Sequence, residues 1–307
     1  MKFGIECYSK MYDGALKLSD LETRGFLVVK NFLNTTEIKV LKWGYEQLRL
    51  NNTSDNDTKH YYEDFKKMFC VPSKVSSIIL PKIKQVSDQI TTTTGIKIDF
   101  EPVQCTGFYA DLKFINGNDG NDSTLVWHQD QGAWTYHQQS YNYINFYIMV
   151  DKDDPTITNL SVIPQDIILD KLPDHADRIV RKGAQRFFPK DDETLVKNDD
   201  TDEEYTLPIN IETIAEHPNL SPGDVLLVRG DILHRSQDNF APRIAASFRV
   251  FENSIINKQK LLAGGEEKHK YLKNNKDRID PLIESFEYFE RDDVTFTEYF
   301  NYMNKLL

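Results

Sequence analysis

Apolar residues recur at helical spacing in the first third of the chain. Residues 73–94 place Ile and Val three and four positions apart, which puts these side chains on one face of a helix. Another helix is expected to begin at 34–37, because Asn34 stands three residues before Glu37, the spacing of a capping box. Residues 19–30 predict a short helix, a glycine stop and a strand over Phe26–Val29.

From about residue 98 the pattern changes to short runs rich in Tyr, Phe, Val, Ile and Thr. Clusters of Gly, Asn and Asp separate these runs, as turns separate strands. Many short strands with turns between them predict an antiparallel sandwich or barrel. The segments expected to be strands are 102–110, 123–128, 143–150, 159–163, 205–210, 224–229 and 243–252.

Two segments interrupt this pattern. Residues 191–204, DDETLVKNDDTDEE, are acidic, and we expect a solvated or disordered surface loop there, with a lid or partner-binding segment as the alternative. Residues 257–307 are charged with periodic aromatics, a spacing typical of helices that pack on a sheet. No linker or repeat divides the chain, so we expect one domain over 1–307. Its parts would be N-terminal helical support (1–97), a core (about 98–252) and a C-terminal helical extension (253–307).

Composition narrows the class of protein. The formal net charge of -11 argues against nucleic acid or an anionic membrane surface as a partner. Three widely spaced cysteines, Cys7, Cys70 and Cys105, form neither a disulfide framework nor a CxxC metal site. The N-terminus lacks the apolar region of a signal peptide, and no run reaches transmembrane length. We therefore expect a cytoplasmic protein with a small-molecule substrate, and the oligomeric state is left open.

The sharpest chemical feature is the segment Trp127-His128-Gln129-Asp130. Residues i and i+2 of a strand point to the same side, so His128 and Asp130 can converge on one ion. A third ligand must come from elsewhere, and His234 is the candidate, near the start of a turn after the strand at 224–229. Two imidazoles and one carboxylate leave three coordination positions open, as iron(II) oxygenases require.

A second set of polar residues follows His234. Ser236 lies two residues further on, and Arg243 begins the strand at 243–252. Arginine presents a planar fork that binds a carboxylate with two hydrogen bonds, and a hydroxyl can add another. The pair could hold the distal carboxylate of a dicarboxylic keto acid that chelates the iron. The alternative is an Arg243 that forms a surface ion pair with Asp238 or Glu252.

These residues and their order resemble the phytanoyl-CoA dioxygenase-like family of Fe(II)/2-oxoglutarate oxygenases. The resemblance covers roughly residues 15 to 252. It is carried by RGFLVVKNFLNTTEI (24–38), WHQD (127–130), NFYIMVDKDD (145–154), SVIP (161–164), SPGDVLLVRGDILHRS (221–236) and PRIAASF (242–248).

The resemblance implies a fold, cofactors and a reaction. The fold would be mainly β with helical additions, a double-stranded β-helix (jelly roll, cupin-like) with helices packed on one sheet. The reaction would use Fe(II), 2-oxoglutarate and O₂, and would release succinate and CO₂. By the match, His128, Asp130 and His234 would bind iron, Arg243 and Ser236 would bind the co-substrate carboxylate, and Tyr147 would contact the co-substrate.

Two features bear on the reaction and the substrate. Related halogenases replace the ligand carboxylate by a small residue, so Asp130 favours hydroxylation. Residues 158–165 lack the glycine and the terminal histidine that relatives carry, and 165–220 is long and acidic. The acyl-CoA substrate of the family is therefore not carried over, and a small-molecule or lipid-like substrate is expected. Candidates for the pocket wall are Gln131, Trp134 and Tyr136, with ordinary packing as the alternative.

Two other function classes stay open. The chain could be a non-catalytic metal-binding jelly-roll module, or a cupin-type metalloenzyme that does not use 2-oxoglutarate. An anchor at Arg243 argues for a carboxylate co-substrate, whereas a fourth histidine ligand would favour the cupin class. The nearest spare histidine, His137, is expected in a loop.

Overall fold

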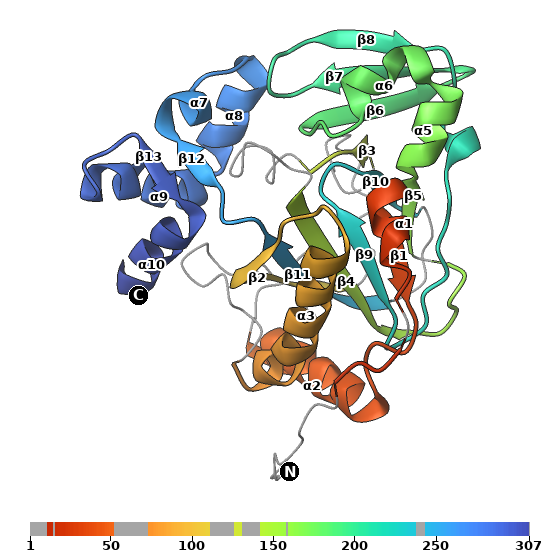
Figure 1. The fold of residues 1–307 in the computed structure, drawn as a ribbon, viewed down its shortest axis with the longest axis vertical. Helices are drawn as coiled ribbons and strands as arrows, with labels where there is room; N and C mark the ends of the chain where they lie inside the picture. Colours follow the sequence, from red (N-terminus) through yellow and green to blue (C-terminus); the bar gives the residue numbers. More distant parts are fainter. Residues whose placement is uncertain are drawn as a thin grey trace.

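Two antiparallel sheets carry most of the strands (Figure 1). The structure is a computed structural model that describes residues 11–14, 16–51, 73–110, 126–130, 142–157, 159–237 and 243–306. The first sheet contains, in spatial order, β1 (Phe26–Val29), β9 (Val225–Arg229), β4 (Tyr143–Lys152), β11 (Arg243–Phe251) and β2 (Asp99–Ala110). The second contains β5 (Leu160–Ile163), β10 (Leu233–Ser236), β3 (Trp127–His128), β6 (Gln185–Lys190), β7 (Glu193–Asn198) and β8 (Glu204–Leu207).

The inner faces of the two sheets share one apolar cluster. Tyr147 and Met149 of β4 pack there with Leu160 and Val162 of β5, and all four side chains are buried. Strand side chains alternate between faces, so the neighbours of these residues point outward. This arrangement confirms the expected mainly β fold of jelly-roll type.

Helices cover the outer face of the first sheet, as predicted. They are α1 (Leu18–Thr23), α2 (Thr35–Asn51) and α3 (Ser73–Thr93). Their apolar faces pack on outward residues of β4 such as Ile144 and Phe146. The expected capping box is present, since the Asn34 amide donates to the Glu37 carboxylate (2.8 Å) and the Glu37 amide donates to Asn34 Oδ1 (3.0 Å).

The outer face of the second sheet is covered by shorter elements. They are α5 (Gln165–Lys171), α6 (Ala176–Ile179) and the 3₁₀ turns Pro173–His175 and Ile211–Ile214. Ile168, Ile179 and Ile211 from these elements pack with Trp127 of β3 and Leu233 of β10. The strands that carry His128 and His234 are thereby supported from behind.

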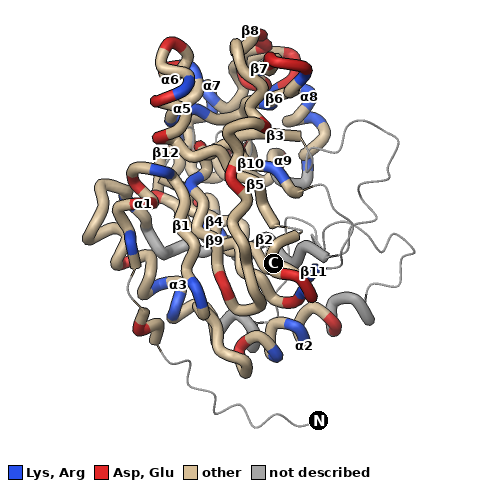
Figure 2. Tube along the Cα trace, turned by 90° about the vertical axis from the view of Figure 1, so that its right-hand side faces the viewer, with Lys and Arg blue, Asp and Glu red and all other residues tan. Residues whose placement is uncertain are grey.

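The expectation of a surface loop at 191–204 is wrong. Half of this segment lies in β7 and at the start of β8, which extend the second sheet and gather acidic residues at its outer end (Figure 2). Thr194 and Val196 are buried, and Val196 packs with Trp127 on the helix-covered outer face, so the alternation of a strand is present beneath the acidic composition. Asp199 accepts two hydrogen bonds of 2.9 Å from Arg186 Nε, which compensates part of its charge.

The C-terminal residues form a helical extension with one small two-stranded sheet. The elements are β12 (Ile255–Asn257), α7 (Lys258–Leu262), α8 (Glu266–Asn274), α9 (Lys276–Tyr288), β13 (Asp293–Thr295) and α10 (Phe296–Leu306). Phe286, Phe296 and Tyr299 pack with Phe251 of β11 and Tyr143 of β4, which confirms the predicted packing of the aromatic residues. Within the described ranges, no helix is both long and apolar enough to cross a membrane.

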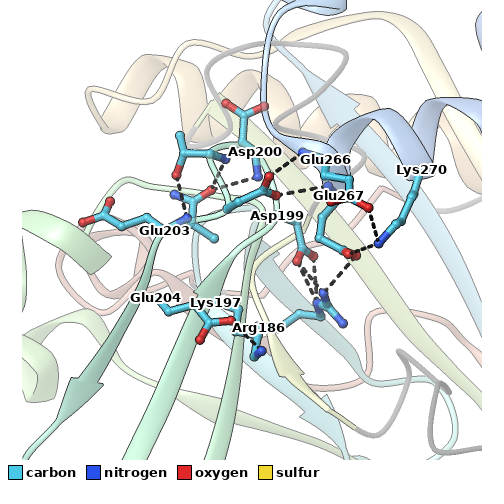
Figure 3. Close-up of polar contacts among 12 residues, drawn as sticks. Arg186, Lys197, Asp199, Asp200, Glu203, Glu204, Glu266, Glu267 and Lys270 are labelled. Atoms are coloured by element: carbon cyan, nitrogen blue, oxygen red, sulfur yellow. Dashed lines mark hydrogen bonds and ion pairs between the residues drawn. The ribbon is translucent and has the colours of Figure 1, made fainter.

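A polar network docks α8 on the turn between β7 and β8 (Figure 3). Asp202 accepts hydrogen bonds from the first backbone amides of α8, at Glu266 and Glu267. Lys268 pairs with Asp200 at 2.7 Å, and Arg186 lies between Asp199 and Glu267. The extension is therefore held against the second sheet by charge and against the first sheet by its aromatic core.

Candidate metal centre

The two candidate histidine ligands face each other across neighbouring strands. His234 of β10 pairs with His128 of β3, and their ring centroids lie 4.4 Å apart. The sequence suggested that His234 lies near the start of a turn. In the structure it lies inside the strand β10. Asp130 lies just past the end of β3, where its backbone amide donates to the Gly230 carbonyl at 3.2 Å. The expected convergence occurs, although Asp130 is outside the regular strand.

The donor atoms of the three residues gather at one point. Asp130 Oδ1 lies 3.9 Å from His128 Nε2 and 3.7 Å from His234 Nε2, and one ligand atom from each residue lies within 4.8 Å of the others. A metal bonded at about 2.1 Å can bridge two donors up to about 4.2 Å apart. Both histidine–carboxylate pairs meet this condition, so the cluster can hold one ion.

Hydrogen bonds set the protonation of both rings. Nδ1 of His128 lies 2.8 Å from the Val126 carbonyl, and Nδ1 of His234 lies 2.8 Å from the Ile232 carbonyl. A carbonyl can only accept, so the neutral form of each ring carries its proton on Nδ1 and leaves Nε2, the nitrogen nearer Asp130, to bind a metal. Burial and the neighbouring His234 lower the pKa of His128 to about 4, which keeps this imidazole neutral and able to bind a metal.

The candidate carboxylate anchor lies on the same inner face. Ser236 follows His234 by two residues, so its side chain points between the sheets about 7 Å further along the strand. Arg243, buried at the start of β11, donates to Ser236 Oγ at 3.2 Å and to the Asn159 carbonyl at 3.4 Å. The structure thus brings Arg243 and Ser236 together across the two sheets.

The other residues predicted near the co-substrate have different outcomes. Tyr147 is buried on the inner face of β4, and its ring centroid lies 5.9 Å from the Arg243 guanidinium carbon. The suggested partner Glu252 instead accepts a hydrogen bond from Asn142, and Asp238 lies outside the described residues. The pocket-wall candidates Gln131, Trp134 and Tyr136, together with His137, also lie outside the described residues.

Comparison with known families gives one decisive match. The family model of phytanoyl-CoA dioxygenase (PhyH) matches residues 21–245, which include the His–Asp–His cluster and Arg243. The chain belongs to this family. No curated protein matches this PhyH-family chain.

Three of the solved structures that match this chain serve for comparison. HygX from Streptomyces hygroscopicus, with nickel and 2-oxoglutarate bound, is 13% identical at a TM-score of 0.43, over 76% of this chain and 85% of its own. EctD from S. alaskensis, with 2-oxoglutarate and 5-hydroxyectoine, is 12% identical at a TM-score of 0.44, and the match covers 80% of each chain. The carbocyclase SnoK from nogalamycin biosynthesis is 11% identical at a TM-score of 0.43, and the match covers 77% of this chain and 83% of SnoK.

Sequence inspection missed two residues that hold the cluster of this PhyH-family protein from behind. Gln129, between the two ligands of the WHQD segment, is 1% exposed and donates to the carbonyls of Ile179 (2.7 Å) and Asp231 (2.8 Å). Asp231 comes three residues before His234, so Gln129 ties the two ligand segments together. Its place between His128 and Asp130 was the available signal, because a strand turns every second side chain away from the ion.

Glu212 acts on the same strands from the outer face. Its carboxylate accepts a hydrogen bond from Trp127 Nε1 at 2.7 Å and pairs with Arg235 at 3.1 Å. Trp127 precedes His128 and Arg235 follows His234, so one carboxylate links the neighbours of both histidines. No sequence pattern pointed to Glu212, since it lies in a 3₁₀ turn remote from both strands in the chain.

Proposed function

We propose that this PhyH-family protein is an Fe(II)- and 2-oxoglutarate-dependent oxygenase that hydroxylates a small-molecule or lipid-like substrate. The observation that carries the proposal is the convergence of His128, Asp130 and His234 on one point, with the Arg243–Ser236 pair on the same inner face. In this reaction class, iron with 2-oxoglutarate supplies the activation of O₂, and succinate and CO₂ are released.

Each residue has a defined task in this proposal. The two imidazoles and the carboxylate would supply two nitrogens and one oxygen to an iron ion, which would leave positions on the ion for co-substrate and O₂. The Nδ1 bonds to backbone carbonyls fix the orientation of both rings. Arg243 and Ser236 present N–H and O–H donors to the distal carboxylate of the co-substrate. The buried apolar cluster between the sheets would keep water away from a bound iron.

The competing functions make different demands on the same residues. A metal-binding module without catalysis needs no anchor for a keto acid, and a 2-oxoglutarate-independent metalloenzyme needs none either. The buried Arg243–Ser236 pair, about 7 Å along β10 from the histidine ligand, therefore favours the 2-oxoglutarate enzyme. Asp130 in the cluster favours hydroxylation, since its carboxylate occupies the position that a halide would need.

The test is an anaerobic titration of the metal-free protein with Fe(II) and 2-oxoglutarate, followed by visible charge-transfer absorption. We expect a band that needs both components. It should disappear in His234→Ala and Arg243→Ala and persist in the control His269→Ala, because His269 is exposed on α8. Folded protein that binds iron but gives no band would overturn the 2-oxoglutarate assignment. Succinate release would then be used to screen substrates.

A further inference from the structure

Lys152 at the end of β4 lies directly opposite Arg243 of β11. The register shifts just before this pair, because Ala245 pairs with Met149 but Ile244 pairs with Asp151. The extra residue is a β-bulge, which reverses the alternation of side chains beyond it. Asp151 accordingly points outward and pairs with Lys42 of α2, whereas Lys152 points to the inner face.

Lys152 and Arg243 meet at one residue. The Lys152 ammonium donates to Asn159 Oδ1 and, at 2.8 Å, to the Ile157 carbonyl, while Arg243 donates to the Asn159 carbonyl at 3.4 Å. Asn159 is fully buried and is held in turn by Gln237, whose side-chain oxygen accepts from the Asn159 amide at 2.7 Å. Two cationic side chains therefore lie at the same end of the inner faces of the two sheets.

No acid among the described residues lies at hydrogen-bond range of the Lys152 ammonium. Lys152 is 8% exposed, and both acceptors of its ammonium are neutral oxygens. Throughout the described ranges, no carboxylate forms an ion pair with it. Burial and the charge of Arg243 lower the pKa of Lys152 to about 8. The other charged groups that act on Lys152 are Asp154, Lys30 and Asp224.

A buried ammonium in this setting is stabilised by an anion between it and Arg243. A carboxylate has two oxygens with about four acceptor positions, enough for the Arg243 fork, the Ser236 hydroxyl and one ammonium N–H. The ammonium has three N–H groups, and two are used by Asn159 and Ile157. The third can therefore serve a ligand.

We propose that Lys152 is a second cation of the co-substrate site, which binds the distal carboxylate of 2-oxoglutarate together with Arg243. The inference rests on the proposed function. It makes the pocket selective for dicarboxylic keto acids over monocarboxylic ones, because two buried cations lie where the distal group ends. The alternative is that Lys152 only fastens the loop between β4 and β5 through its bonds to Ile157 and Asn159.

The experiment is anaerobic calorimetric titration of the Fe(II)-loaded protein with two probes, 2-oxoglutarate and 2-oxopentanoate, which lacks the distal carboxylate. In Lys152→Gln we expect binding of 2-oxoglutarate to weaken about 10- to 100-fold, the loss of one charge-assisted hydrogen bond. Binding of 2-oxopentanoate should change less than about twofold. Lys152→Arg keeps the charge and should bind 2-oxoglutarate within about tenfold of wild type. Lys42→Gln, on the outer side of the same bulge, is the matched control.

If Lys152→Gln weakens the binding of both probes equally, or of neither, Lys152 is not a second cation of the co-substrate site. Its role would then be to hold the loop between β4 and β5. A wild-type protein that binds no 2-oxoglutarate overturns the proposed function itself, so the two failures are distinct. If Lys152→Gln does not fold, proton uptake by the wild-type protein tests the role of Lys152 instead. At a pH just above 8 its binding of 2-oxoglutarate, but not of 2-oxopentanoate, should take up a proton in paired buffers. Equal uptake with both probes, or none, would refute the assignment.

Discussion

Replacement of Gln129 by leucine tests how the fold holds the metal cluster. Leucine is close to glutamine in volume but cannot donate to the carbonyls of Ile179 and Asp231. A buried acceptor left without its donor costs about 1–3 kcal/mol. The Ile179 carbonyl keeps a longer hydrogen bond from the Lys182 amide at 3.3 Å, so the free-energy cost at this carbonyl lies at the lower end of that range.

The magnitude follows from these contacts. About 1 kcal/mol for the Ile179 carbonyl and about 2 kcal/mol for that of Asp231 sum to about 3 kcal/mol. Gln129 Oε1 is buried without a hydrogen-bond partner among the described residues, and its removal returns part of this cost. We expect a net loss of about 2–3 kcal/mol in the free energy of unfolding. Iron affinity should fall about 10- to 100-fold, because both ligand segments lose their common tie.

Urea denaturation measures the stability, and anaerobic Fe(II) titration at 25 °C measures the affinity of the folded variant. The matched control is Gln259→Leu, an exposed glutamine whose amide donates to Asp292 at 3.2 Å, remote from the cluster. Gln129→Glu supplies a second comparison, because it keeps the shape but sets an acceptor against two carbonyls. Unchanged iron affinity in a Gln129→Leu protein that has lost stability would refute the positioning role. Unchanged stability would refute the hydrogen-bond reasoning as well.

Three further predictions concern other parts of the molecule. Lys82→Met should lower the free energy of unfolding by about 3–5 kcal/mol in urea, because it leaves the buried Glu37 carboxylate without its 2.6 Å partner; a loss below about 1 kcal/mol would contradict this. Phe296→Ala should cost about 3–5 kcal/mol, since this buried ring packs edge-on at 4.3 Å against Phe251. A separate early transition in thermal unfolding would instead show that the extension unfolds independently of the sheets. Affinity for 2-oxoglutarate should be full while Lys152 is charged, decline as the pH rises above about 8, and stay flat in Lys152→Arg; equal declines in both proteins would exclude Lys152 as the cause.

Local pattern was enough to predict most elements and the chemistry of the site. Runs rich in aromatic and β-branched residues, with turn clusters between them, predicted β4, β5, β9 and β11, and helical spacing predicted α3, because these signals depend only on neighbours in the chain. The i, i+2 spacing of His128 and Asp130 predicted a shared ion. His234 and Arg243 followed from their order and from the family resemblance.

Tertiary structure alone decided which side chains support that chemistry. The acidic composition of 191–204 concealed two strands, since a hairpin at a sheet edge can keep charges on one face and bury Val196 on the other. A bulge in β4 turned Lys152 toward Arg243, and a bulge is a property of the pairing between strands, which one strand's sequence does not show. Gln129 and Glu212 act on residues between 23 and 102 positions away. Such contacts exist only once the two sheets and their covering helices have assembled.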